Sequence, residues 1–65
     1  MIGLTKLNNQ NFVVNADLIK FIESTPDTLV TLTTGERLLV KETSEEVIRR
    51  VVQYGRMLRR LLEPS

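Results

Sequence analysis

The chain has 65 residues, a formal net charge of +1, and neither cysteine nor histidine. This length leaves room for one small domain, and the missing residue types exclude disulfides, histidine- or cysteine-based catalysis and the commoner zinc sites. A domain this small is marginal as a monomer, and oligomerisation is the aid that remains.

The sequence also bears on the compartment and on nucleic acid. It has no apolar run of 18 residues, and residues 1–9 lack the charged-then-apolar order of a signal peptide. We therefore expect a cytoplasmic protein. A net charge near zero argues against a dedicated nucleic-acid binder, which usually carries a strong basic excess.

The N-terminal segment predicts two strands joined by a tight turn. Residues 2–7 alternate loosely, with Ile2 and Leu4 on one face, and residues 12–14 form the second strand. The polar cluster at 8–11 suits a turn, because asparagine tolerates left-handed backbone angles. The two strands are therefore expected to form a hairpin.

The segment 18–23, LIKFIE, fits either a short helical turn or a strand. Its β-branched and aromatic content favours a strand, which places Ile19 and Phe21 on one face and Leu18 and Ile22 on the other. Both faces are then apolar, so we expect both to be covered. Ser-Thr-Pro-Asp follows and predicts a turn.

The clearest hairpin pattern spans residues 28–42, with Gly35 near its centre. A two-residue loop would mix the two faces of the strands. A three-residue loop at 33–35 instead places Val30 opposite Leu38, and it gives Gly35 the left-handed position of a bulged turn. We therefore predict the three-residue loop.

That register divides the hairpin into two faces. Leu32 and Val40 share the face of the expected core, while Leu29 and Leu39 form a cross-strand pair on the other face. The second face also carries polar side chains and is therefore half apolar. This composition suggests burial against a second copy.

Residues 44–62 predict one amphipathic α-helix. Thr43 and Glu46 have the spacing of a capping box, and Pro64 follows as a stop signal. Apolar residues recur at intervals of 4, 3, 4 and 3 along a heptad-like seam, comprising Val47, Val51, Tyr54, Leu58 and Leu61. Flanking apolar residues widen this seam to more than half of the circumference, so the helix needs partners on more than one side.

The predicted fold is therefore α+β. An antiparallel β-meander of four to five short strands, about residues 2–42, is followed by one C-terminal helix, about residues 44–62, in a single domain 1–65. We predict self-association through the apolar residues of the hairpin and the seam: Leu29, Leu39, Val47, Val51, Tyr54, Leu58 and Leu61. Gly55 within the helix is interpreted as a point where a backbone from the sheet or from a second helix comes close.

The arginines Arg49, Arg56 and Arg60 cluster on the side of the helix opposite the seam. The simplest interpretation is a solvated face with ion pairs at i, i+4, such as Glu45–Arg49 and Glu46–Arg50. The alternatives are a docking surface for an acidic partner and, more weakly, contact with nucleic acid. These three arginines are the candidate partner-binding residues.

Other site types find no support in the sequence. The acids Asp17, Glu23 and Asp27 lack the spacing of a calcium loop, and the glycines are too isolated for a phosphate loop. We predict no catalytic, cofactor-binding or metal-binding residue. A peripheral membrane helix, with Leu58, Leu61 and Leu62 inserting into lipid, is a third hypothesis after protein and nucleic-acid binding.

Three blocks of the sequence, distributed along most of the chain, resemble the flagellar FlbD family, which includes SwrD. They are Met1 to Asn8, Leu18 to Thr28 and Gly35 to Val47. Asn9 departs from the family pattern, which usually has glycine there. The resemblance implies a cytoplasmic, non-enzymatic accessory factor of flagellar motility, linked to the stator and to swarming and acting through protein contacts. It supplies no catalytic or ligand residues.

Overall fold

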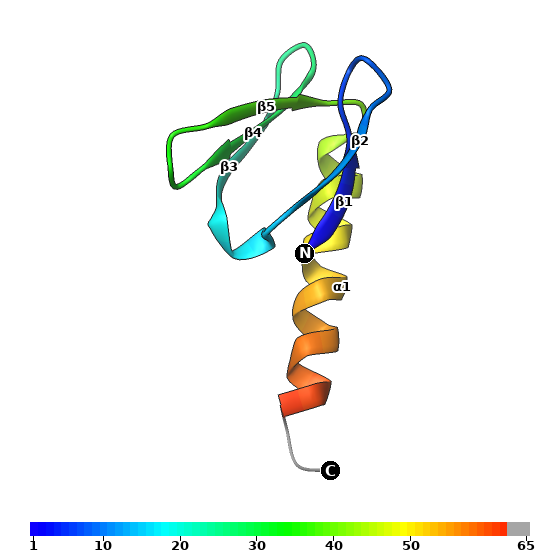
Figure 1. Cartoon of the computed structure of the whole chain (residues 1–65), viewed down its shortest axis with the longest axis vertical. Helices are drawn as coiled ribbons and strands as arrows, with labels where there is room; N and C mark the ends of the chain where they lie inside the picture. Colours follow the sequence, from blue (N-terminus) through cyan, green and yellow to red (C-terminus); the bar gives the residue numbers. More distant parts are fainter. Residues whose placement is uncertain (63–65) are drawn as a thin grey trace.

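The structure is a computed structural model that describes residues 1–62 of the chain. In chain order its elements are β1 (Ile2–Thr5), β2 (Asn11–Val14), the 3-10 helix η1 (Ala16–Leu18), β3 (Ile19–Ser24), β4 (Thr28–Leu32), β5 (Arg37–Val40) and α1 (Ser44–Leu62). The predicted α+β fold is confirmed, with antiparallel strands preceding one C-terminal helix (Figure 1). Pro64, the predicted stop signal, lies outside the described residues.

The strands form two sheets instead of one continuous meander. β1 pairs with β2, and β3, β4 and β5 form the second sheet in that order. The change of sheet occurs at η1, where the Asn15 side chain accepts a hydrogen bond from the Asp17 N–H at 3.0 Å and turns the chain. The sheets meet again where the Lys41 N–H donates to the Thr5 carbonyl at 2.8 Å.

The hydrophobic core lies where both sheets face the first turns of α1. It contains small and medium aliphatic side chains from every element except β3, namely Ile2, Leu4, Val14, Ala16, Val30, Leu32, Val40 and Val47. Among the described helix residues, Val47 is the one that is fully buried. The core is therefore built mainly by strands, and α1 closes it with its N-terminal end.

The hairpin of β4 and β5 has the predicted loop and register. Val30 pairs with Leu38, and Leu29 pairs with Leu39. The loop is closed by a 2.8 Å hydrogen bond from the Leu32 N–H to the carbonyl of Glu36. Gly35 has φ +95°, which is the left-handed geometry predicted for it.

The N-terminal hairpin also forms, but β1 ends at Thr5 and not at Leu7. The turn begins at Lys6, whose N–H donates to the Gln10 carbonyl at 2.9 Å. Asn9 occupies the left-handed region with φ 72°, as its residue type allows. The predicted turn is therefore confirmed, with its start two residues earlier.

The segment 18–23 is a strand from Ile19 onward, but the predicted assignment of its faces is wrong. Ile19 pairs with Leu32 and Phe21 pairs with Thr31, so the intervening Lys20 forms a bulge. The extra residue breaks the alternation of side chains. Ile19 and Ile22 consequently both pack on the core.

Phe21 accordingly faces outward, and 53% of it is exposed. The expectation that both faces of this strand are covered is therefore not met within the chain. The Lys20 ammonium lies 5.3 Å from the centre of the Phe21 ring, which is within the range of a cation–π contact.

Thr43 caps α1 as predicted, while the second half of the capping box is replaced. The Thr43 hydroxyl accepts a 3.1 Å hydrogen bond from the Glu46 N–H. The Glu46 carboxylate binds Arg49 on the next turn instead of reaching back to the cap. The predicted Glu45–Arg49 ion pair is therefore replaced by Glu46–Arg49, and the predicted Glu46–Arg50 pair forms at 3.9 Å.

The helix packs against β1 and β3 with its N-terminal part, and its C-terminal part extends past the strands (Figure 1). Nineteen residues in α1 correspond to a length of about 28 Å. Within residues 1–62, no helix combines the length and the hydropathy that a membrane crossing requires.

Candidate interaction surface

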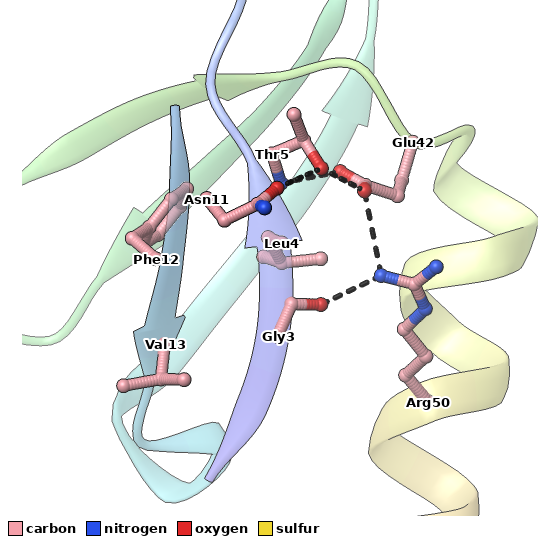
Figure 2. Close-up of a pocket in the computed structure, with 8 residues that line it drawn as sticks. All are labelled: Gly3, Leu4, Thr5, Asn11, Phe12, Val13, Glu42 and Arg50. Carbon is pink, nitrogen blue, oxygen red and sulfur yellow. Dashed lines mark hydrogen bonds and ion pairs between the residues drawn. The ribbon is translucent and has the colours of Figure 1, made fainter. Parts of the chain in front are cut away.

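A polar cluster lies at the junction of α1 with the N-terminal hairpin. The Glu42 carboxylate accepts hydrogen bonds from the Thr5 N–H at 2.9 Å and from the Thr5 hydroxyl at 2.8 Å. The Arg50 guanidinium donates to the Gly3 carbonyl at 2.6 Å and lies 3.4 Å from Glu42 Oε2. Figure 2 shows Arg50 extending from the helix to reach both the strand and the carboxylate.

Glu42 is ionised in this cluster at neutral pH. Burial raises the pKa of its carboxyl, but hydrogen bonds from the Thr5 N–H, the Thr5 hydroxyl and its own N–H, together with the charge of Arg50, outweigh burial. The pKa is therefore lowered below 4.5. The described side chains leave no buried polar atom without a hydrogen-bond partner.

The cluster borders an open hollow of about 540 Å³ between the hairpin and the helix (Figure 2). Gly3 forms part of its wall, and a Cβ atom added there would meet nothing within 4 Å. Because the polar groups of the hollow already pair with one another, their geometry supports a structural connection between α1 and β1.

The sequence did not reveal this cluster, because its members are far apart in the chain. Thr5 and Glu42 are 37 residues apart. Glu42 precedes the predicted helix by two residues, a position that resembles an ordinary solvated strand end. Within the cluster, only Glu42 and Arg50 lie near each other in the sequence, at a spacing of eight residues, and could have suggested a contact.

Burial falls steadily along the predicted seam of α1. Val47 has no exposed surface, and Val51, Tyr54 and Leu58 are half-buried. Leu61, at the far end of the seam, is 75% exposed. The first half of the seam therefore serves the core, and the second half has no covering element in the described chain.

We call residues 57–62 the free end of the helix. Three of its four apolar side chains are exposed to solvent: Met57, Leu61 and Leu62. Exposed leucines that continue a buried seam differ from scattered surface leucines, because their neighbours already form an apolar row. Of the predicted self-association residues, Leu58 and Leu61 lie in the free end, and Leu61 is exposed there.

Leu29 and Leu39, the other predicted contact residues, lie elsewhere. They pair across β4 and β5 as predicted, with Leu29 half-buried and Leu39 exposed. They occupy the face of that sheet opposite Val30, which packs in the core with Val47. The structure therefore separates the hairpin pair from the helix seam.

The three candidate arginines are all exposed, but one of them already has a close partner. Arg49 binds Glu46 in a bidentate pair with distances of 2.5 and 2.6 Å. That hydrogen-bonded pair lowers the pKa of Glu46 and raises that of Arg49. Arg56 and Arg60 lie one turn apart and border a common hollow.

Gly55 does not have the neighbour that was predicted from the sheet. A Cβ atom built at this position meets nothing within 4 Å. The sheet therefore does not explain the glycine, and close approach by a second helix remains a prediction.

Among the described residues there is no group of three or more carboxylates, histidines or cysteines that could hold a metal ion. The family model described as "FlbD: Flagellar and Swarming motility proteins" matches residues 1–58 of the chain. No curated protein and no solved structure matches it. The matched region includes every strand and most of α1, and it ends within the free end of the helix.

Proposed function

Because this chain belongs to the FlbD family of flagellar and swarming motility proteins, we propose that it is a non-enzymatic cytoplasmic accessory protein of the flagellar motor. In this proposal it supports the motor or its stator through protein–protein contacts, and it associates with a second copy of itself. The proposal rests on one observation above the others, the seam of α1 that continues as exposed apolar surface beyond the core.

The energetic reason is the apolar area at the free end. Covering Leu61 and Leu62, which are 75% and 79% exposed, would contribute about 25 cal/mol for each Å² removed from water. A second helix offers a complementary seam of the same spacing, so like seams can pack. The hollow beside Glu42 is also consistent with a role in binding, because its polar groups pair with one another and stabilise the fold.

The assembly part is tested by sedimentation velocity on the purified full chain across a hundredfold range of concentration. Wild type is expected to shift towards a dimer or a larger assembly as concentration rises. The double variant Leu61→Gln, Leu62→Gln should sediment as a monomer, because it removes apolar surface without touching the core. Val13→Gln is the matched control, since Val13 is 69% exposed but lies on the hairpin.

The motility part is tested by complementing a deletion strain with the same variants. Loss of swarming on deletion, rescue by wild type and by Val13→Gln, and no rescue by the double variant would support the proposal. Full rescue by a double variant that is strictly monomeric would show that self-association through the free end is not needed for motility.

A further inference from the structure

Three open hollows follow one another along α1 and share lining residues. The hollow of about 540 Å³ beside Glu42 shares Gly3 and Arg50 with a second of about 280 Å³. The second shares Gln53 and Met57 with a third of about 290 Å³. We call this surface, from Glu42 to Arg60, the helix furrow.

The chemistry of the furrow changes along its length. At the hairpin end, the Glu42 carboxylate accepts hydrogen bonds from Thr5 and forms an ion pair with Arg50. Its negative charge is therefore already neutralised within the chain. The middle is apolar, with Tyr54 half-buried and Met57 exposed. The far end is bordered by two exposed guanidinium groups, those of Arg56 and Arg60.

Positive charge on α1 also increases towards the far end of the furrow. Residues 47–62 contain five arginines and no acidic residue, whereas both acids of the described helix are in its first turn. A ligand lying along the furrow therefore meets apolar surface followed by positive charge. Arg56 and Arg60 are separated by about 6 Å along the helix axis, which is the spacing of carboxylates one turn apart on a partner helix.

We propose that the helix furrow binds an acidic amphipathic segment of a flagellar protein partner. This inference rests on the proposed function and names the chemistry of its partner. An apolar side chain of the segment lies over Tyr54 and Met57, and two carboxylates pair with Arg56 and Arg60. Charge complementarity of this kind selects the partner and accelerates its association.

Two other occupants fit less well. The equivalent part of α1 from a second copy would bring arginines against arginines, and like charges in contact oppose binding. A bilayer presents a broad flat surface with no fixed spacing of charges, whereas Arg56 and Arg60 lie one turn apart beside the apolar Met57. A protein segment can fill the hollows with side chains.

The test uses the full chain in flagellated cells, with a photoreactive phenylalanine derivative in place of Met57. The same group at Ile48, which is also exposed but lies on another side of α1, is the control. Cross-linked peptides are then sequenced by mass spectrometry. The expected product links position 57 to an acidic amphipathic segment of one partner, with little product from position 48.

A charge exchange completes the test. Arg56→Glu, Arg60→Glu is expected to lower the cross-link yield about tenfold, which corresponds to about 1.4 kcal/mol, and changing the partner's acids to arginine should restore it. Cross-linking only to this chain itself, to lipid or to a basic segment, with no product from an acidic partner segment, would overturn the inference. So would an absence of any product that depends on Met57.

Failure here is distinguishable from failure of the proposed function. Arg56→Glu, Arg60→Glu leaves the free-end leucines in place, so its self-association by sedimentation should match wild type. If that variant still self-associates and still supports swarming, the furrow has no role in partner binding while the proposed function stands. Both arginines are exposed, and circular dichroism should show an unchanged helix.

Discussion

Glu42 connects the start of the 19-residue helix α1 to the N-terminal hairpin. Its two oxygens satisfy the N–H and the hydroxyl of Thr5, and its charge offsets that of Arg50. Arg50 in turn binds the Gly3 carbonyl, so the free edge of β1 is covered by side chains (Figure 2). A covered strand edge is protected from pairing with another strand.

Stability should therefore depend on pH through Glu42. Because its folded-state pKa lies below its ordinary value of 4.5, the stabilisation is complete above that pH and is lost as pH falls through the folded-state pKa. Glu42→Gln is expected to lower the free energy of unfolding at pH 7 by about 1.5–3 kcal/mol and to flatten its decline in acid. Urea titrations from pH 7 to pH 3 measure both effects.

Glu46→Gln is the comparison for that experiment. Its pKa is also lowered, chiefly by the hydrogen bond from Arg49, but this ion pair is exposed and should contribute less. Superimposable pH curves for wild type and Glu42→Gln would show that the cluster does not stabilise the folded chain.

Asn9 offers a second test at the scale of one residue. Its φ of 72° lies in the left-handed region, where a β-branched side chain is strained. Asn9→Val is expected to reduce the free energy of unfolding by about 1–2 kcal/mol, and Asn9→Gly by much less. Thermal unfolding of the three proteins measures the difference, with Gln10→Val, at an exposed position of the same turn, as the control.

At the scale of elements, the sequence predicted what neighbouring residues determine. The β4–β5 hairpin formed with its loop and register because Gly35 and the alternating valines and leucines specify both locally. The α1 bounds followed from Thr43 and the apolar period. These features need no information about distant parts of the chain.

The features that were missed depend on distant partners. The bulge at Lys20 exists because Ile19 and Ile22 must both reach a core supplied largely by other elements. The division into two sheets depends on how far η1 turns the chain, and the Glu42 cluster depends on β1. Period and residue type do not encode these three-dimensional relations, so the candidate site was predicted on the helix alone.

Gly55 is the position in α1 where we predict close approach by a second helix. Since a Cβ would meet nothing within 4 Å, Gly55→Ala should raise the free energy of unfolding of the monomer by about 1 kcal/mol through helix propensity alone. If a second helix packs closely at this position, the same change should also weaken self-association. Circular dichroism and sedimentation together separate these effects.

One outcome of the Gly55→Ala experiment would contradict the predicted helix packing. A stabilised variant with unchanged self-association would exclude close helix packing at Gly55. Gln53→Ala serves as the matched control, because Gln53 is another exposed residue in the same helical region and carries no predicted role in self-association.

At the scale of the whole molecule, the small core limits what a single copy can hold. Globular domains have roughly 0.05–0.15 kcal/mol of stability per residue, so a chain of 65 residues has about 3–10 kcal/mol. Of the described helix residues, only Val47 adds a fully buried side chain to the core. The C-terminal part of α1 therefore gains little from the core and has most to gain from a partner.

Thermal stability should consequently depend on protein concentration. Association that binds only the folded chain adds stability as concentration rises, and 1 kcal/mol corresponds to roughly 4–8 °C in a domain of this size. We expect the Tm of wild type to rise by several degrees over a hundredfold increase in concentration. Leu61→Gln, Leu62→Gln should abolish this rise, whereas Arg56→Glu, Arg60→Glu should retain it. A wild-type Tm that stays constant over the range would mean that the exposed seam serves a different protein and not a second copy.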